Sequence, residues 1–158
     1  MSAFARIIAT WFGCGYVPKG PGTAGSLGGL LVAFLFAQWV QVPPVFFALL
    51  AVILLAPAIW AAGVVAREDQ TEDPQIVVVD EVVGQWITLA GAGHLNHAQN
   101  WKSWLLAFGL FRLFDIWKPW PVRQLEKLPG GTGILMDDVM AGIYGALVLF
   151  VAGWFNLY

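Results

Sequence analysis

Charged side chains lie at the ends of apolar runs in this chain. A charge near hydrocarbon costs free energy, so such residues usually have a functional role. They form a compact set of oxygen and nitrogen groups in three clusters along the sequence. Carboxylates in such a set can bind a divalent cation or move protons, and the basic groups can bind an anion. The carboxylates are Asp80, Glu81, Asp115, Asp137 and Asp138, and the neighbouring cations are Arg112, Lys118 and Arg123.

Acidic residues at a helix start can also be simple caps that complement the helix dipole. Two acidic pairs and Asp115 together favour a shared site, because two carboxylates about 6 Å apart repel by roughly 3 kcal/mol at an effective dielectric near 20. A divalent cation removes that repulsion, and all-oxygen ligation suits Mg²⁺ or Mn²⁺. Arg112, Lys118 and Arg123 are then free to hold an anionic substrate, as phosphoryl transfer requires.

A second phosphate-friendly segment is the Gly-rich run from Pro18 to Ser26, which leads directly into an apolar stretch. Its backbone N–H groups can approach an anion, and Lys19, Thr23 and Ser26 add a charge and two hydroxyl donors. The run lacks the residue order of a Walker motif. Proline and glycine also commonly open a membrane helix, so both interpretations stay open.

The elements that carry these groups are strongly apolar. The 158 residues are 59% hydrophobic and only 11% charged, with a mean hydropathy of +0.72. No Asp, Glu, Lys or Arg occurs between Lys19 and Arg67 or after Asp138. We therefore predict one domain over 1–158, an all-α polytopic membrane protein with four to five membrane-embedded segments.

The expected segments follow from hydropathy and turn residues. The segment near Asp80 to Gly93 is too short to cross a bilayer unaided and is predicted to be tilted or re-entrant. Pro57 is predicted to kink its helix without ending it. A single helical turn is expected within 119–133. The segments are 24–40, 45–66, 80–93, 101–117 and 138–158.

Alternating these segments places seven of the eight basic residues and all ten carboxylates on one side of the membrane. The positive-inside rule makes that side cytoplasmic. The net charge of −2 argues against a nucleic-acid partner. Cys14 cannot form an internal disulfide, and His94 and His97 fall in the loop on the far side, which makes a metal role there improbable.

Four blocks of sequence resemble the bacterial phosphatidylglycerophosphatase A family. They occur in order along the whole chain and read GCGYVPKGPGTAGSL, VVVDEVVGQWITL, FRLFDIWKPWPVRQLE and GGTGILMDDVMAG. The resemblance implies a mainly helical, Mg²⁺-dependent phosphatase of the bacterial inner membrane that converts phosphatidylglycerophosphate into phosphatidylglycerol. The implied motif acids are Asp80, Glu81, Asp115, Asp137 and Asp138, and the implied motif bases are Lys19, Arg112, Lys118 and Arg123.

With the resemblance, Asp80, Asp115, Asp137 and Asp138 become the predicted Mg²⁺ ligands and Glu81 the predicted general base. Asp80 and Asp115 are also candidate catalytic groups, because a covalent aspartyl-phosphate is an alternative to direct attack by water. A phosphatase or phosphotransferase that acts on another membrane lipid is the alternative enzyme. A non-catalytic helical membrane subunit or small transporter is the alternative outside enzymes. The sequence leaves the oligomeric state and the number of metals open. The predicted substrate-binding residues are Lys19, Thr23, Ser26, Arg112, Lys118 and Arg123.

Overall fold

A computed structural model describes residues 3–92 and 100–158, and within those ranges it contains helices and no strand, which confirms the predicted all-α class. His94 and His97 lie outside the described residues. The helices are α1 (Ala3–Ala9), η1 (Cys14–Tyr16), α2 (Pro21–Val40), α3 (Val45–Asp69), α4 (Val79–Ala90), α5 (Trp101–Trp117), α6 (Val122–Leu125) and α7 (Gly131–Trp154).

Three of these helices, α2, α3 and α7, are long and apolar enough to cross a membrane. Many of their large apolar side chains are exposed, among them Leu31, Val52 and Val151, as expected for surfaces that face lipid. α5 has 17 residues and α4 has 12, so the count of four to five membrane-embedded segments is approximate. The absence of charge from the middle of the three long helices is the reason that they can lie in hydrocarbon.

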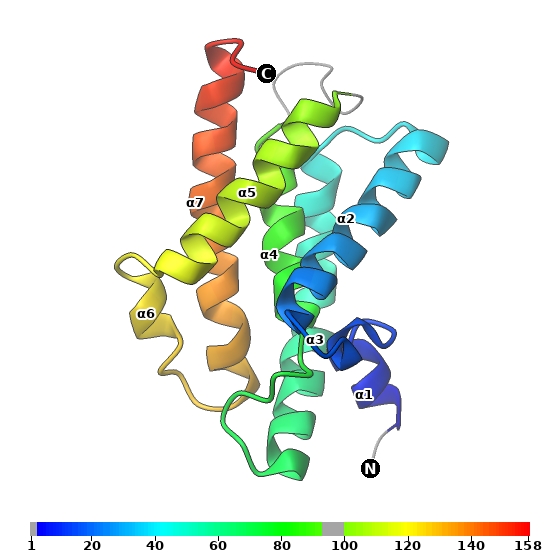
Figure 1. The fold of residues 1–158 in the computed structure, drawn as a ribbon, viewed down its shortest axis with the longest axis vertical. Helices are drawn as coiled ribbons and strands as arrows, with labels where there is room; N and C mark the ends of the chain where they lie inside the picture. Colours follow the sequence, from blue (N-terminus) through cyan, green and yellow to red (C-terminus); the bar gives the residue numbers. More distant parts are fainter. Residues whose placement is uncertain (1–2, 93–99) are drawn as a thin grey trace.

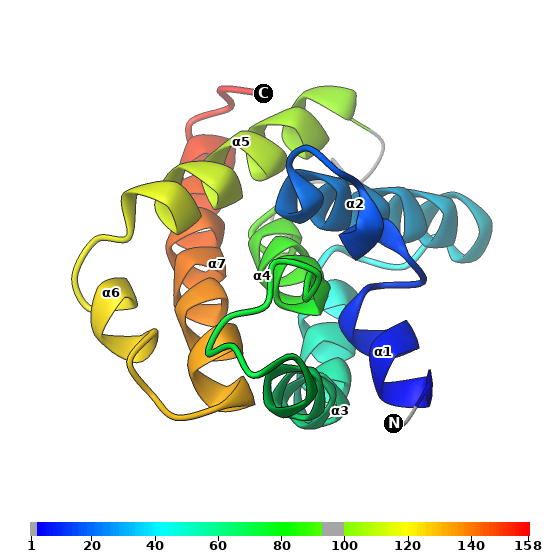
Figure 2. The same ribbon diagram turned by 60° about the horizontal axis from the view of Figure 1, so that its bottom comes forward.

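The short helix α4 lies at the centre of the molecule, between α2, α3, α5 and α7 (Figures 1 and 2). Small residues permit this close packing. A Cβ on Gly29 of α2 would lie 3.0 Å from Val82 of α4, and a Cβ on Gly142 of α7 would lie 2.5 Å from the carbonyl oxygen of Gly84. Trp86 of α4 donates a hydrogen bond to the carbonyl of Gly29 over 2.9 Å.

The helices α2, α3, α4, α5 and α7 alternate in direction along the long axis of the molecule (Figure 1). α1, the connection 70–78 and the connection 118–130 all lie toward the lower end in that view, and the C-terminus lies at the upper end. The predicted gathering of the charged connections at one end is therefore present in the fold. α4 starts well above the lowest turns of α3 in this view.

The last helix begins earlier than the sequence predicted. α7 starts at Gly131, so Asp137 and Asp138 lie in its second turn and not at its start. Gly130, with φ of 63°, provides the break before it. A Cβ on Gly131 would lie 2.0 Å from the carbonyl oxygen of Ile59, so only glycine lets this helix start against α3.

Two further boundaries concern α3 and α6. α3 continues through Pro57 to Asp69, so the charged residues 67–69 form its last turn and belong to no loop. α6 is the single turn of helix expected in the connection after α5. α4 begins at Val79, next to the expected Asp80.

Candidate active site

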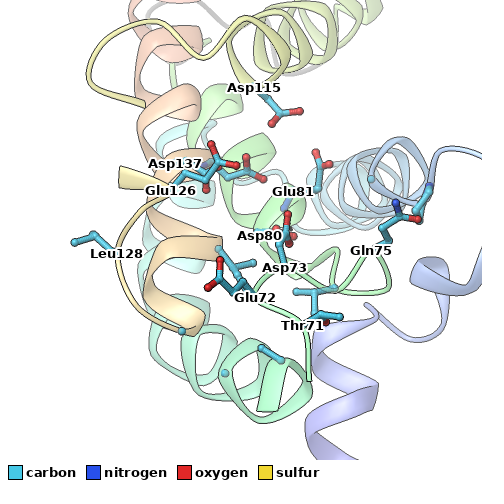
Figure 3. A pocket seen from close by; sticks show the side chains of 18 of the residues that line it. Thr71, Glu72, Asp73, Gln75, Asp80, Glu81, Asp115, Glu126, Leu128 and Asp137 are labelled. Atoms are coloured by element: carbon cyan, nitrogen blue, oxygen red, sulfur yellow. Dashed lines mark hydrogen bonds between the residues drawn. The ribbon is translucent and has the colours of Figure 1, made fainter. Parts of the chain in front are cut away.

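A cavity of about 1080 Å³ is lined by the first turn of α4 and by residues of the charged connections 70–78 and 118–130. Figure 3 shows carboxylates of α4, α5 and α7 around this one space. Among the residues that the structure describes, eight carboxylates and four cations line it, an excess of four negative charges. The carboxylates are Glu72, Asp73, Asp80, Glu81, Asp115, Glu126, Asp137 and Asp138, and the cations are Arg67, Arg112, Lys118 and Lys127.

Glu81 is held from two sides in the upper wall of the cavity. The Ser26 hydroxyl of α2 donates to Glu81 Oε2 over 2.9 Å, and Arg112 of α5 forms an ion pair with the same oxygen. Arg112 also contacts Asp115 Oδ2 over 2.8 Å, one turn later on its own helix. A Cβ on Gly22 would lie 2.0 Å from Glu81 Oε1, so the glycine makes room for the carboxylate. Three helices thus orient this group.

Lys118 organises the opposite wall. Its ammonium group donates to Asp137 Oδ2 over 2.8 Å and lies 3.3 Å from Glu126 Oε2. Asp137 and Asp138 are only 5% and 4% exposed, and the Asp138 N–H donates to Asp137 Oδ1 over 3.0 Å. Lys118 itself adopts a left-handed backbone conformation, with φ of 45°, at the end of α5. The turn after α5 therefore aims this cation into the cavity.

Asp80 and Lys118 have shifted pKa values. Burial raises the pKa of the Asp80 carboxyl well above its usual value, and the neighbouring charge of Glu81 raises it further. Burial alone would lower the pKa of Lys118, but its hydrogen bond to Asp137 and the charges of Asp137 and Glu126 outweigh burial and raise it. Asp80 is thus a carboxylate that gains from a cation, and Lys118 stays protonated at neutral pH.

The predicted site residues do not all reach the cavity wall. The wall contains Asp80, Glu81, Thr23, Arg112, Asp115, Lys118, Asp137 and Asp138. Ser26 is fully buried behind Glu81. Lys19 is exposed beside two lining residues, Pro18 and Gly20, and Arg123 lines a separate cavity.

Two residues of this region escaped the sequence analysis. Glu126 lines the cavity and shares Lys118 with Asp137, although its surroundings in the sequence resemble an ordinary solvated connection. Gln85 lies one helical turn after Glu81 and is fully buried, and its amide nitrogen and oxygen have no hydrogen-bond partner among the described residues. Its place in the middle of an apolar run was the available signal.

The donor set of the cavity suits a hard divalent cation, since every acidic side chain offers only oxygen. Within residues 3–92 and 100–158, no group of three or more His, Cys, Asp or Glu is arranged to hold a metal ion. Arg112 and Lys118 occupy carboxylate oxygens that such an ion would use. A metal would therefore exchange with these cations, whereas Asp80 and Asp138 form no ion pair with a cation among the described residues.

Comparison with known proteins adds to this geometry. Residues 7–153 match the family model described as Phosphatidylglycerophosphatase A. The chain belongs to this family. The match includes α2, α3, all of α7 except Trp154, and every residue that lines the cavity. The predicted family is therefore confirmed.

Curated relatives agree with membership of the phosphatidylglycerophosphatase A family. The Phosphatidylglycerophosphatase A of Haemophilus influenzae is 36% identical over 96% of this chain and 90% of its own length. The protein of the same name from Escherichia coli is 31% identical over 94% of this chain and 83% of its own length. A putative phosphatidylinositol-3-phosphatase of Bacteroides thetaiotaomicron is 40% identical over 94% of this chain and 92% of its own length. No solved structure matches the chain.

Proposed function

We propose that this chain removes the terminal phosphate of phosphatidylglycerophosphate and releases phosphatidylglycerol and inorganic phosphate. The observation that carries the proposal is the acid-lined cavity at the ends of apolar helices, where a lipid head group and its acyl chains can both be accommodated. Membership of the family and the names of two relatives support the substrate.

Mg²⁺ is the proposed cofactor, and Asp80, Asp115, Asp137 and Asp138 would hold it. An excess of four negative charges in the cavity wall would repel a phosphate dianion unless cations balance it. The bound ion would supply charge neutralisation for the phosphoryl group. The raised pKa of Asp80 supports this role, because a cation nearby would favour its ionised form.

Arg112 and Lys118 would bind the phosphate oxygens once their own carboxylate partners are satisfied by the cofactor. Glu81 is the proposed general base. It would take a proton from water, and the water oxygen would attack phosphorus. The bond from phosphorus to the glycerol oxygen would break, and the protonated Glu81 would return its proton to that oxygen. The hydrogen bond from Ser26 supports this role because it keeps Glu81 at the cavity wall.

The active site is proposed to face the cytoplasm, in a protein that crosses the bacterial inner membrane several times. Seven of the eight basic residues belong to segments near the cavity end, and Lys102 at the start of α5 is the remaining one. An excess of lysine and arginine is typical of cytoplasmic connections.

A second candidate substrate is a phosphoinositide. The relative from Bacteroides thetaiotaomicron, at 40% identity, carries the name of a putative phosphatidylinositol-3-phosphatase, which favours this alternative. Both head groups place a phosphate monoester on a polyol that is joined to the lipid through a phosphodiester. The chemistry of the cavity is the same for both, so substrate preference must be measured.

The test is phosphate release by the purified protein in detergent from three lipids: phosphatidylglycerophosphate, phosphatidylinositol 3-phosphate and phosphatidic acid. We expect release that is fastest with the first lipid and abolished by a chelator. Asp80→Asn and Asp138→Asn should lower the rate by at least about a hundredfold, whereas Asp69→Asn, outside the cavity, should lower it less than about threefold. Release from none of the lipids would overturn the function, and normal rates in both cavity variants would overturn the carboxylate metal site.

A further inference from the structure

A second cavity of about 400 Å³ lies on the outer side of the turn between α5 and α6. It adjoins the first cavity through Lys118, which lines both. Its lining residues are Trp117, Lys118, Pro119, Trp120, Arg123 and Gln124.

The charge of this second cavity is opposite to that of the first. Among the described residues, its lining contains two cations and no carboxylate. The ammonium of Lys118 contacts Asp137 and Glu126 of the acid-lined cavity, where it is proposed to bind the terminal phosphate, so Arg123 is the cation that remains for a ligand in the second cavity. The Arg123 side chain is exposed and forms no ion pair within the described residues. An arginine of this kind binds phosphate oxygens in a bidentate manner.

The surroundings of this cavity are those of a membrane interface. Trp117 and Trp120 are 64% and 76% exposed, and Leu113 and Ile116 on the last turns of α5 are also exposed. Tryptophan prefers the head-group level of a bilayer, and exposed aliphatic side chains beside it face acyl chains. A ligand here would therefore place its phosphate at Arg123 and its hydrocarbon along α5.

We propose that the second cavity binds the internal phosphodiester of the lipid substrate while the terminal phosphate monoester occupies the acid-lined cavity. This inference rests on the proposed function. In phosphatidylglycerophosphate a single glycerol unit separates the two phosphates, and in the structure the two cavities adjoin at a shared lining residue, Lys118. Recognition of the diester selects lipids with a phosphorylated polyol head group over phosphatidic acid, whose one phosphate is the monoester itself.

The experiment compares wild type with Arg123→Gln at saturating Mg²⁺, with phosphatidylglycerophosphate as substrate and two competitive inhibitors. Phosphatidylglycerol carries only the diester, and inorganic phosphate represents only the monoester. We expect Arg123→Gln to raise KM and the inhibition constant of phosphatidylglycerol at least about tenfold, with kcat and the inhibition constant of inorganic phosphate within about threefold of wild type. Lys102→Gln, an exposed cation at the far end of α5, should change none of these values.

The outcomes separate the two proposals. A wild-type protein that releases no phosphate from this lipid overturns the proposed function. An active wild type with unchanged phosphatidylglycerol inhibition in Arg123→Gln overturns the second cavity as a diester site. Equal weakening of both inhibitors also overturns it, because Arg123 would then act only through the summed charge of the surface.

Discussion

At the scale of single residues, Lys118 connects the parts of the site. It contacts Asp137 and Glu126, lines both cavities and occupies the left-handed turn that ends α5. Removing its charge leaves Asp137 unpaired in a nearly closed environment.

The pH dependence of this interaction follows from the raised pKa of Lys118. A folded-state pKa above the unfolded value means that the contribution to stability is complete below the ordinary lysine pKa of 10.5 and is lost only as pH rises through the folded-state pKa. We expect Lys118→Met to lower the free energy of unfolding by about 1–3 kcal/mol, less than for a fully buried pair. Thermal unfolding in detergent should show the same difference at every pH from neutral to 10.5; a difference that shrinks earlier contradicts the ion pair.

Gln85 presents the opposite situation, a buried amide without a partner among the described residues. An amide in this state costs about 1–3 kcal/mol. Gln85→Met, which keeps the size and removes the polar atoms, should therefore raise the midpoint of thermal unfolding. A lower midpoint would mean that the amide is satisfied in the working protein, for example by a buried water.

At the scale of helices, the contact between α2 and α4 determines where Glu81 lies. Gly22→Ala would push its new methyl group into Glu81 Oε1, the mobile end of a side chain, so the helices can stay in place while the carboxylate moves. We expect kcat to fall at least about tenfold with little change in unfolding temperature. Gly109→Ala on α5 is the matched control, because nothing lies within 4 Å of its Cβ, and it should leave kcat unchanged. Equal kcat in both variants would contradict a role for the position of Glu81.

The helices were more predictable than the contacts between them. Long uncharged runs mark α2 and α3 well, because hydrocarbon excludes charge over a fixed length. The start of α7 was missed, since it depends on the close approach of Gly131 to Ile59 on a distant helix. The site acids stood out for the same reason as the helices, as charges beside apolar runs.

Pairing within the site required the structure. Arg112 meets Glu81 across 31 positions and Lys118 meets Asp137 across 19, which depends on how each helix is rotated in the bundle. Arg123 was predicted to bind substrate together with Lys118, and the structure places both residues in the lining of the second cavity. Sequence spacing has no information about such rotations, because several helix arrangements bury the same apolar faces.

At the scale of the whole molecule, the alternation of helices has a consequence for topology. The N-terminal helix α1 lies toward the cavity end and the C-terminus lies at the opposite end (Figure 1). With a cytoplasmic cavity, we expect a reporter fused after Tyr158 to show that the C-terminus is periplasmic. A reporter fused before Met1 should show that the N-terminus is cytoplasmic. Two reporters on the same side would contradict the alternation, and exchange of the two sides would contradict the cytoplasmic cavity.

The ion pairs inside the acid-lined cavity also make its two proposed ligands thermodynamically dependent on each other. A phosphate that takes Arg112 and Lys118 releases Glu81 and Asp137, and a cation that takes carboxylates releases Arg112 and Lys118. Each ligand thus removes a competitor of the other, which is positive heterotropic linkage and is reciprocal by necessity. Free Mg²⁺ or free phosphate alone must break these pairs without replacement. The ion pairs therefore neutralise only part of the acidic wall at rest, and the cavity favours simultaneous occupation by metal and phosphate over binding of either one alone.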